Sequence, residues 1–194
     1  MVKKIIMVIT YSSNEIKKIK IKNFKLLESL SGKKKSIQDF FSDRATVIMF
    51  ICNHCPYVKH INPELVRLTN DYIPKGISFL AINSNDIEKY PEDSPENMKK
   101  ISHKLGYIFP YFFDEKQEVA KYYDAQCTPE FFIFNGIGDL YYHGQLDDSR
   151  PNNGIPVTGY DVRKILNSLL EYDGVKKIYP IKKPSYGCNI KWKK

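Results

Sequence analysis

Two continuous apolar runs dominate the hydropathy pattern of this chain. They span Ala45–Ile51 and Ile77–Asn83 and are rich in β-branched and aromatic residues. Runs of this kind are typical of central strands that are buried on both faces of a sheet. Between them, apolar residues recur at steps of three and four, which predicts an amphipathic helix that starts near Cys55. The residues of this stripe are Val58, Ile61, Leu65, Leu68 and Tyr72.

The remaining segments predict strands and helices that alternate along the chain. Ser94-Pro95-Glu96 combines a cap residue, a first-turn proline and an early acid, as a helix start does. A turn over 135–138 joins two strand-like runs into a hairpin. Other expected elements are an extended segment over 21–27, a short element over 37–41, a short helix over 117–123, strands over 130–134 and 139–144, and a helix over 158–170. This order predicts an α/β fold with a central sheet covered by helices on both sides.

The chain has 194 residues, which fits one domain with extensions. We expect an N-terminal arm over 1–20, a domain over 21–175 and a C-terminal tail over 176–194 that carries Cys188. The apolar run Ile5–Ile9 is shorter than the roughly 7–15 residues of a secretory signal, so an arm or strand is expected and a signal peptide is the alternative. No run approaches the roughly 18 apolar residues of a membrane span. A cytoplasmic location is expected, with export as the alternative.

The formal net charge of +8 raises the question of a nucleic-acid partner. However, the lysines are scattered over 17–35 and 176–194, and no nucleic-acid-binding motif accompanies them. A solvated basic surface is the simpler interpretation. We therefore expect no nucleic-acid partner, and the sequence does not indicate an oligomeric state.

Cys52-Asn53-His54-Cys55 stands where the first buried strand meets the helix. A thiol attacks a disulfide as its thiolate, and the amides and partial positive charge of a helix N-terminus favour that anion. The spacing lets a second thiol resolve the mixed disulfide that the first one forms. We expect Cys52 to be the nucleophile, Cys55 to resolve, and His54 to activate the pair.

A zinc site is the structural alternative for this motif. His54 or His60, with Cys127 or Cys188, would have to complete the ligand set. The sequence offers no second C-x-x-C and no paired histidine motif, and a junction after a buried strand is the setting of redox cysteines. We therefore expect neither a metal nor a cofactor.

Thr128-Pro129-Glu130 places a proline directly before a strand. With this feature, the chain resembles the thioredoxin-like, peroxiredoxin-like members of the alkyl hydroperoxide reductase/thiol-specific antioxidant (redoxin) superfamily over about residues 24–193. The matching segments are Phe50–His60, Ala81–Asp86, Ser94–Met98, Ala125–Phe132, Gly144–Pro151 and Pro184–Trp192.

The resemblance implies a thioredoxin fold with a mixed central sheet, an N-terminal extension and a helical insertion. It also implies a cis peptide at Thr128–Pro129 facing the dithiol, and thiol–disulfide exchange with protein or small-molecule disulfides and thiols. In thioredoxin a Trp precedes the first cysteine and a buried Asp accepts its proton. Here Ile51 and Thr46 occupy the corresponding places, so proton transfer must differ, through Glu130 or water.

Two alternative functions remain beside thiol–disulfide exchange. One is a thiol peroxidase, which is disfavoured because peroxiredoxins carry a hydroxyl residue three positions before the reactive cysteine, where Met49 precedes Cys52. The other is a non-enzymatic metal-binding or scaffold thioredoxin fold. Cys127 and Cys188 are candidates for a redox relay, since a third sulfur can pass electrons on. The alternative is that both are reduced, semi-buried thiols.

Overall fold

The computed structural model describes residues 9–13, 19–171 and 181–194. Its helices are α1 (Pro56–Tyr72), α2 (Pro95–Leu105), α3 (Glu118–Tyr123) and α4 (Tyr160–Glu171), with 3₁₀ turns η1 (Ile37–Phe40), η2 (Ile73–Lys75) and η3 (Pro91–Asp93). Its strands are β1 (Ile9–Tyr11), β2 (Lys25–Glu28), β3 (Lys33–Ser36), β4 (Ala45–Phe50), β5 (Ile77–Asn83), β6 (Tyr111–Phe113), β7 (Cys127–Thr128), β8 (Glu130–Asn135), β9 (Leu140–Gly144), β10 (Ile181–Lys183) and β11 (Tyr186–Asn189). The rest of the expected arm and tail lies outside the described residues.

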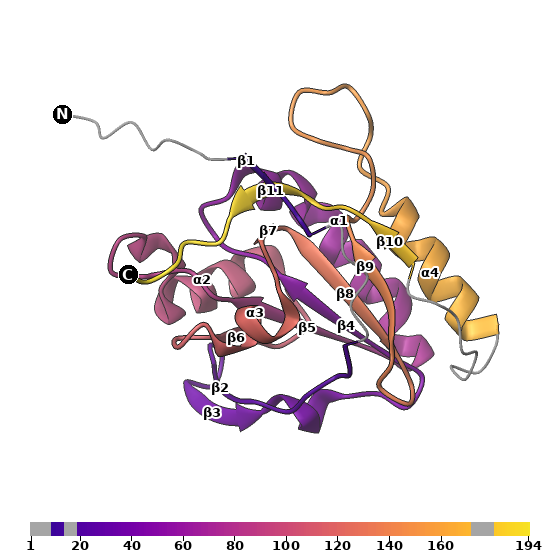
Figure 1. The fold of residues 1–194 in the computed structure, drawn as a ribbon, viewed down its shortest axis with the longest axis horizontal. Coiled ribbons are helices and arrows are strands. Elements are labelled where there is room, and N and C mark those ends of the chain that lie inside the picture. Colours follow the sequence, from indigo (N-terminus) through magenta and orange to yellow (C-terminus); the bar gives the residue numbers. More distant parts are fainter. Residues whose placement is uncertain (1–8, 14–18, 172–180) are drawn as a thin grey trace.

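The main sheet confirms the predicted mixed α/β architecture. Within the described residues it has eight strands in the order β10-β9-β8-β4-β5-β6-β2-β3. β4, β5 and β6 run parallel, whereas β8 is antiparallel to β4 and continues into the hairpin with β9. The two apolar runs of the sequence are β4 and β5, and they lie side by side in the middle of the sheet (Figure 1).

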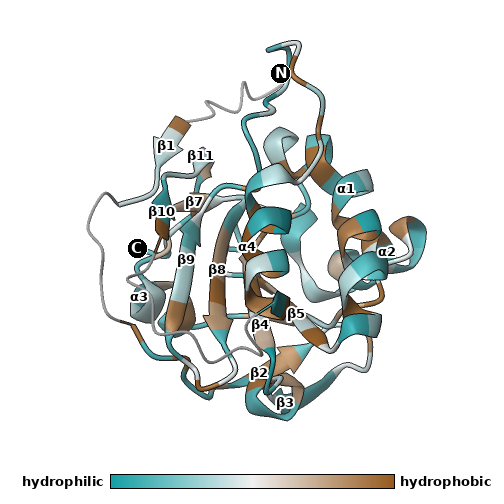
Figure 2. Ribbon diagram, turned by 90° about the vertical axis from the view of Figure 1, so that its right-hand side faces the viewer, coloured by the Kyte–Doolittle hydropathy of each residue, from teal (hydrophilic) through white to brown (hydrophobic). Residues whose placement is uncertain are grey.

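The sheet buries a separate apolar core on each of its faces. Val47 and Met49 of β4 belong to the core beneath α1, α2 and α4. Ile48 and Phe50 of the same strand belong to the core beneath α3 and η1. Figure 2 shows α1, α2 and α4 together on one side of the sheet and α3 on the other. Because successive side chains of a strand point to opposite faces, only a continuous apolar run can fill both cores.

The first helix begins where the sequence pattern predicts. Cys55 is its N-cap residue, Pro56 occupies the first turn, and the helix continues through Pro63. A proline is tolerated in the first turn because its missing N–H has no partner in the helix there. β4 ends at Phe50, so the dithiol lies in the short connection between the central strand and α1.

A second, smaller sheet of β1, β11 and β7 crosses one end of the molecule. The peptide bond between Thr128 and Pro129 is cis, as expected, and Thr128 belongs to β7. β11 pairs with β7 in antiparallel fashion, and β1 pairs with the other edge of β11. In Figure 1 these two strands, from opposite ends of the chain, lie side by side above β7. The sequence pattern did not predict β7, β11 or their pairing.

Glu130, the first residue of β8, holds the backbone that precedes the cis-proline. Its side chain is fully buried, and Oε2 accepts hydrogen bonds from the amides of Gln126 (2.8 Å) and Cys127 (3.1 Å). Its other oxygen pairs with the ring of His143 on β9. A buried carboxylate with these partners fixes the loop relative to the sheet, because each partner would lose its acceptor if the loop moved.

Removal of this carboxylate should destabilise the whole domain. We expect Glu130→Ala to lower the free energy of unfolding by about 3–5 kcal/mol, since it leaves two amides and a histidine without a buried partner. Urea unfolding followed by circular dichroism measures the change. Glu96→Ala, which removes an exposed helix ion pair with Lys100, is the control and should leave the unfolding midpoint nearly unchanged. Equal effects of the two substitutions would contradict this role of Glu130.

Candidate functional site

The cis-proline loop lies directly against the dithiol. Cys52 Sγ is 3.4 Å from Thr128 Oγ1, and Cys55 Sγ is 3.3 Å from the main-chain oxygen of Thr128. Both cysteines are almost completely buried, at 1% and 0% exposure. All cysteines of the chain are free thiols. One residue of the loop thus contacts both sulfur atoms of the motif.

The surroundings of Cys55 favour its negative charge. Burial raises the pKa of this thiol, but hydrogen bonds from Cys188, Cys52, Thr128 and the amide of Val58 outweigh burial and lower the pKa below its ordinary value of 9.0. Val58 lies in the first turn of α1, so its amide is one of the donors that the helix leaves without an internal partner. The predicted effect of the helix N-terminus therefore acts on Cys55.

The surroundings of Cys52 favour its neutral form. Burial raises the pKa of the Cys52 thiol, and the hydrogen bond to Cys55 and the negative charge of Asp93 raise it further. The contact with Thr128 acts in the opposite direction but is weaker. The neighbours of the two thiols therefore shift their pKa values in opposite directions, upward for Cys52 and downward for Cys55.

His54 is held in place by a buried carboxylate that the sequence analysis missed. Asp93 Oδ2 lies 2.6 Å from His54 Nδ1, and Oδ1 accepts the amide of Asn53 at 2.7 Å. The side-chain amide of Asn85 donates to Oδ2 at 2.8 Å. The imidazole stacks on the ring of Tyr90, with 5.0 Å between centroids. These contacts fix both the orientation of the ring and the nitrogen that faces the carboxylate.

Asp93 places a buried carboxylate near the dithiol, although Thr46 occupies the strand position where thioredoxin has its Asp. It lies at the end of η3, within the acidic loop 86–93 that follows β5, and its side chain is fully buried. Thr46, at the strand position where thioredoxin has its Asp, instead accepts the amide of Ser42 at 3.0 Å. β4 and β5 are parallel, so the loops after both strands meet at one edge of the sheet. That rule could have pointed to an acid of the loop as the partner of His54.

Donor atoms of Cys52, His54 and Asp93 lie within 4.8 Å of one another, the only such group among the described residues. Sulfur, imidazole and carboxylate ligands together suit zinc. However, Asp93 already binds the amide of Asn53, the side chain of Asn85 and the ring of His54. A metal would have to displace some of these contacts, so the present geometry is that of a hydrogen-bonded loop.

The remaining predicted residues lie in two different environments. Cys188 and Cys55 belong to the same buried cluster, and their interaction raises the pKa of Cys188 and lowers that of Cys55, which places a third sulfur near the dithiol. Cys127 has its sulfur 3.8 Å from the carboxylate of Glu130, and burial and that neighbouring charge raise its pKa. Glu130, one of the two expected routes for proton transfer to the dithiol, has its oxygens bound to His143 and to loop amides.

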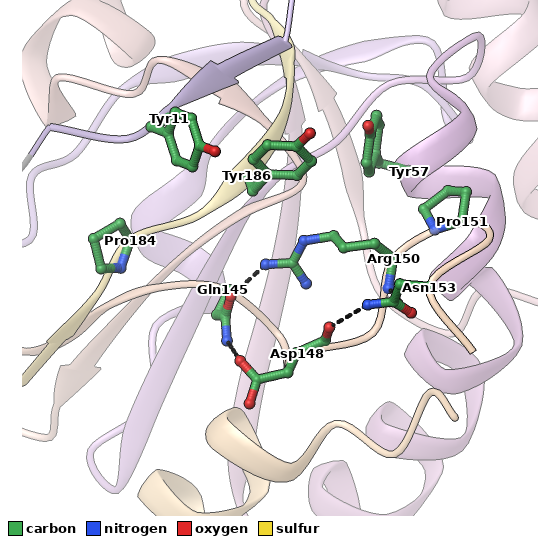
Figure 3. A pocket seen from close by; sticks show the side chains of 9 residues that line it. All are labelled: Tyr11, Tyr57, Gln145, Asp148, Arg150, Pro151, Asn153, Pro184 and Tyr186. Atoms are coloured by element: carbon green, nitrogen blue, oxygen red, sulfur yellow. Dashed lines mark hydrogen bonds between the residues drawn. The ribbon is translucent and has the colours of Figure 1, made fainter. Parts of the chain in front are cut away.

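An open pocket of about 700 Å³ lies beside the cis-proline loop (Figure 3). Tyr57 and Tyr186 form part of its wall, with 5.4 Å between their ring centroids. Arg150 reaches into it and donates to the side chain of Gln145 and to main-chain oxygens. A narrower cavity lined by some of the same residues continues to Pro129. Arg150 belongs to the loop after β9 and lines this pocket.

Two solved structures match nearly the whole chain. An uncharacterized conserved protein from Geobacillus kaustophilus is 58% identical, with a TM-score of 0.89 over 96% of this chain and 97% of that one. A hypothetical protein from Sinorhizobium meliloti 1021 is 38% identical, with a TM-score of 0.87 over 95% and 98% of the two chains. A thioredoxin-family thiol:disulfide interchange protein from Chlorobium tepidum is 17% identical, with a TM-score of 0.60 over 80% and 99%. The chain therefore has the expected thioredoxin fold.

A curated relative extends this comparison to sequence. The thiol-disulfide oxidoreductase ResA of Halalkalibacterium halodurans is 21% identical over 115 residues, which cover 59% of this chain and 61% of the length of that protein. The model of the AhpC/TSA family matches residues 18–143, which include the dithiol, the acidic loop and the cis-proline. The match covers more than half of the chain, and the chain belongs to the AhpC/TSA family.

Proposed function

We propose that this protein is a thiol–disulfide oxidoreductase that uses Cys52 as nucleophile and Cys55 as resolving thiol. The observation that carries the proposal is the contact of one cis-proline-loop residue, Thr128, with both sulfur atoms. An arrangement of two adjacent thiols at a helix N-terminus, one with a lowered pKa, supplies the thiolate that exchange requires.

The neighbours of each sulfur support this choice of roles. Cys55 is enclosed by Cys188, Thr128 and the first turn of α1, so a partner molecule has little access to it. Cys52 lies on the side of His54 and has fewer sulfur neighbours. The Cys55 thiolate can take the proton of Cys52, because both sulfur atoms lie against the same residue, Thr128. This transfer makes Cys52 the attacking sulfur while the pair keeps its single negative charge.

Exchange then takes place in two balanced steps. The Cys52 thiolate attacks a partner disulfide, forms a mixed disulfide and releases one partner thiolate. Cys55 loses its proton, attacks Cys52 and releases the second partner thiolate, which leaves a Cys52–Cys55 disulfide and a reduced partner. His54, held by Asp93, donates or accepts the protons at Cys52. The reverse sequence oxidises a dithiol partner.

The large pocket, which shares wall residues with the narrow cavity at Pro129, is the candidate binding surface for the partner. Tyr57 and Tyr186 provide an aromatic wall for the carbon chain of a disulfide or peptide. The guanidinium of Arg150, held by neutral oxygens, can bind a carboxylate or peptide oxygen. Both protein and small-molecule disulfides satisfy this chemistry.

The first test compares disulfide reduction with peroxide consumption. We expect the wild-type protein to catalyse reduction of insulin disulfides by dithiothreitol, and Cys52→Ser to lower this turnover to background because no mixed disulfide can form. Cys127→Ser, which changes a thiol directed toward Glu130, is the control and should keep wild-type turnover. Rapid consumption of hydrogen peroxide without insulin reduction would instead favour the thiol peroxidase.

The charge of the reduced dithiol is testable by titration. Because the pKa of Cys55 lies below 9.0, its thiolate should persist as the pH falls through neutrality and disappear only in acid. Ultraviolet thiolate absorbance between about pH 4 and 8, where tyrosines stay protonated, measures it. In Cys55→Ser, burial and Asp93 still raise the pKa of Cys52, so the signal should be absent over this range. A wild-type midpoint at or above pH 9.0 would contradict this charge distribution.

Asp93 is proposed to position His54. We expect Asp93→Asn to lower insulin turnover at pH 7 by about 10²-fold, because the imidazole loses its carboxylate partner. The pH profile should also shift, because the Asp93 charge that raises the pKa of Cys52 is removed. Asp86→Asn is the matched control from the same loop: Asp86 pairs with Lys89 and not with His54. If Asp93→Asn reduced turnover equally at every pH, the carboxylate would have only a structural role.

A further inference from the structure

Strand β11 places Cys188 directly over the cis-proline loop. In the antiparallel pairing of β7 and β11, Cys188 lies opposite Thr128, the residue that contacts both sulfurs of the dithiol. Residues opposite each other in an antiparallel pair project to the same face of the sheet. Cys188 therefore faces the dithiol, and it belongs to the same buried cluster as Cys52 and Cys55.

The same pairing directs Cys127 away from the dithiol. Cys127 lies opposite Asn189, one position along both strands, and successive side chains alternate between faces. Its sulfur is accordingly found 3.8 Å from Glu130 Oε2. Of the two cysteines that the sequence offered as relay thiols, only Cys188 shares a face with the motif.

Gly187 permits the close approach of β11. A Cβ atom at this position would lie 2.1 Å from the main-chain oxygen of Thr128, which is far inside contact distance. Hydrogen bonds on both sides of Cys188 also hold the strand. After it, the amide of Lys191 donates to Asn85 Oδ1 at 2.8 Å. Before it, the main-chain oxygen of Ser185 accepts the amide of Ser12 at 3.0 Å. Cys188 is thus held beside Cys55 by backbone contacts on both sides.

We propose that Cys188 is a third redox-active thiol, which attacks Cys55 Sγ in the oxidised enzyme and moves the disulfide from Cys52–Cys55 to Cys55–Cys188. This inference rests on the proposed function, which supplies the Cys52–Cys55 disulfide. The Cys55–Cys188 bond forms as the Cys52–Cys55 bond breaks, and the bonding electron pair leaves on the sulfur of Cys52. The proton of Cys188 ends on Cys52 or His54. No external oxidant or reductant takes part.

Oxidation itself prepares Cys188 for this attack. In the reduced enzyme, the hydrogen bond to Cys55 is the largest cause that raises the pKa of Cys188, followed by burial. When Cys55 enters a disulfide, it carries no charge, and this cause is removed. Cys188 lies in the same buried cluster as Cys55, so this sulfur is within the site and available as its exchange partner. The product is an oxidised enzyme in which the nucleophile Cys52 is again a free thiol.

The Cys52→Ser variant isolates the proposed sulfur pair. The full chain is oxidised with diamide, unfolded, alkylated with iodoacetamide and digested with trypsin. Cleavage after Arg44, Lys59, Lys182 and Lys191 places Cys55 on peptide 45–59 and Cys188 on peptide 183–191. We expect the two peptides to be joined by a disulfide. The disulfide between the two peptides should be absent when Cys188→Ser or Cys188→Ala is added. It should persist when Cys127→Ser is added as the matched control.

The wild-type chain tests the exchange. After oxidation we expect two species: peptide 45–59 with an internal disulfide, and peptide 45–59 joined to 183–191 with Cys52 alkylated. If folded Cys52→Ser protein, verified by circular dichroism, gave Cys55 and Cys188 both alkylated, the inference would be wrong. The internal disulfide and insulin turnover of the wild type would still support the proposed function. Absence of both from the wild type, with joined peptides in Cys52→Ser, would contradict the proposed function but support the Cys55–Cys188 pair.

Discussion

Thr128 is the residue through which the parts of this site are connected. Its hydroxyl contacts Cys52, its main-chain oxygen contacts Cys55, and its backbone pairs with the strand that carries Cys188. The cis peptide bond also joins Thr128 to Pro129. A displacement of this one residue would therefore change the surroundings of Cys52, Cys55 and Cys188.

Two buried carboxylates fix the loops on either side of the dithiol. Glu130 holds the backbone before the cis-proline, and Asp93 holds the loop that contains His54. Each carboxylate receives main-chain amides, which offset the free-energy cost of burying its charge. The network continues from Asp93 through Asn85 to Lys191, so the tail is bonded to the same loop. Rigidity of the site thus comes from polar contacts, while the apolar cores fix the sheet beneath it.

The parts of the fold that follow a local pattern could be predicted from the sequence. The apolar run 45–51 and the stripe from Val58 to Tyr72 gave β4 and α1, and hence the position of the dithiol. β11 could not be predicted in this way, because Tyr186–Asn189 is short, contains a glycine, and is stabilised by pairing with distant residues. Asp93 was missed for a related reason: its partners are contributed by two loops that only the sheet brings together.

The position of β11 late in the chain has a consequence for biosynthesis. The ribosome makes Cys52 and Cys55 long before the strand that covers them, and at about 5–20 residues per second this interval is on the order of ten seconds. During that time the nascent dithiol lacks both its third sulfur and its cover. The C-x-x-C motif of the emerging chain therefore lacks β11 during this interval, whereas in the finished protein β11 is paired with β7 beside it.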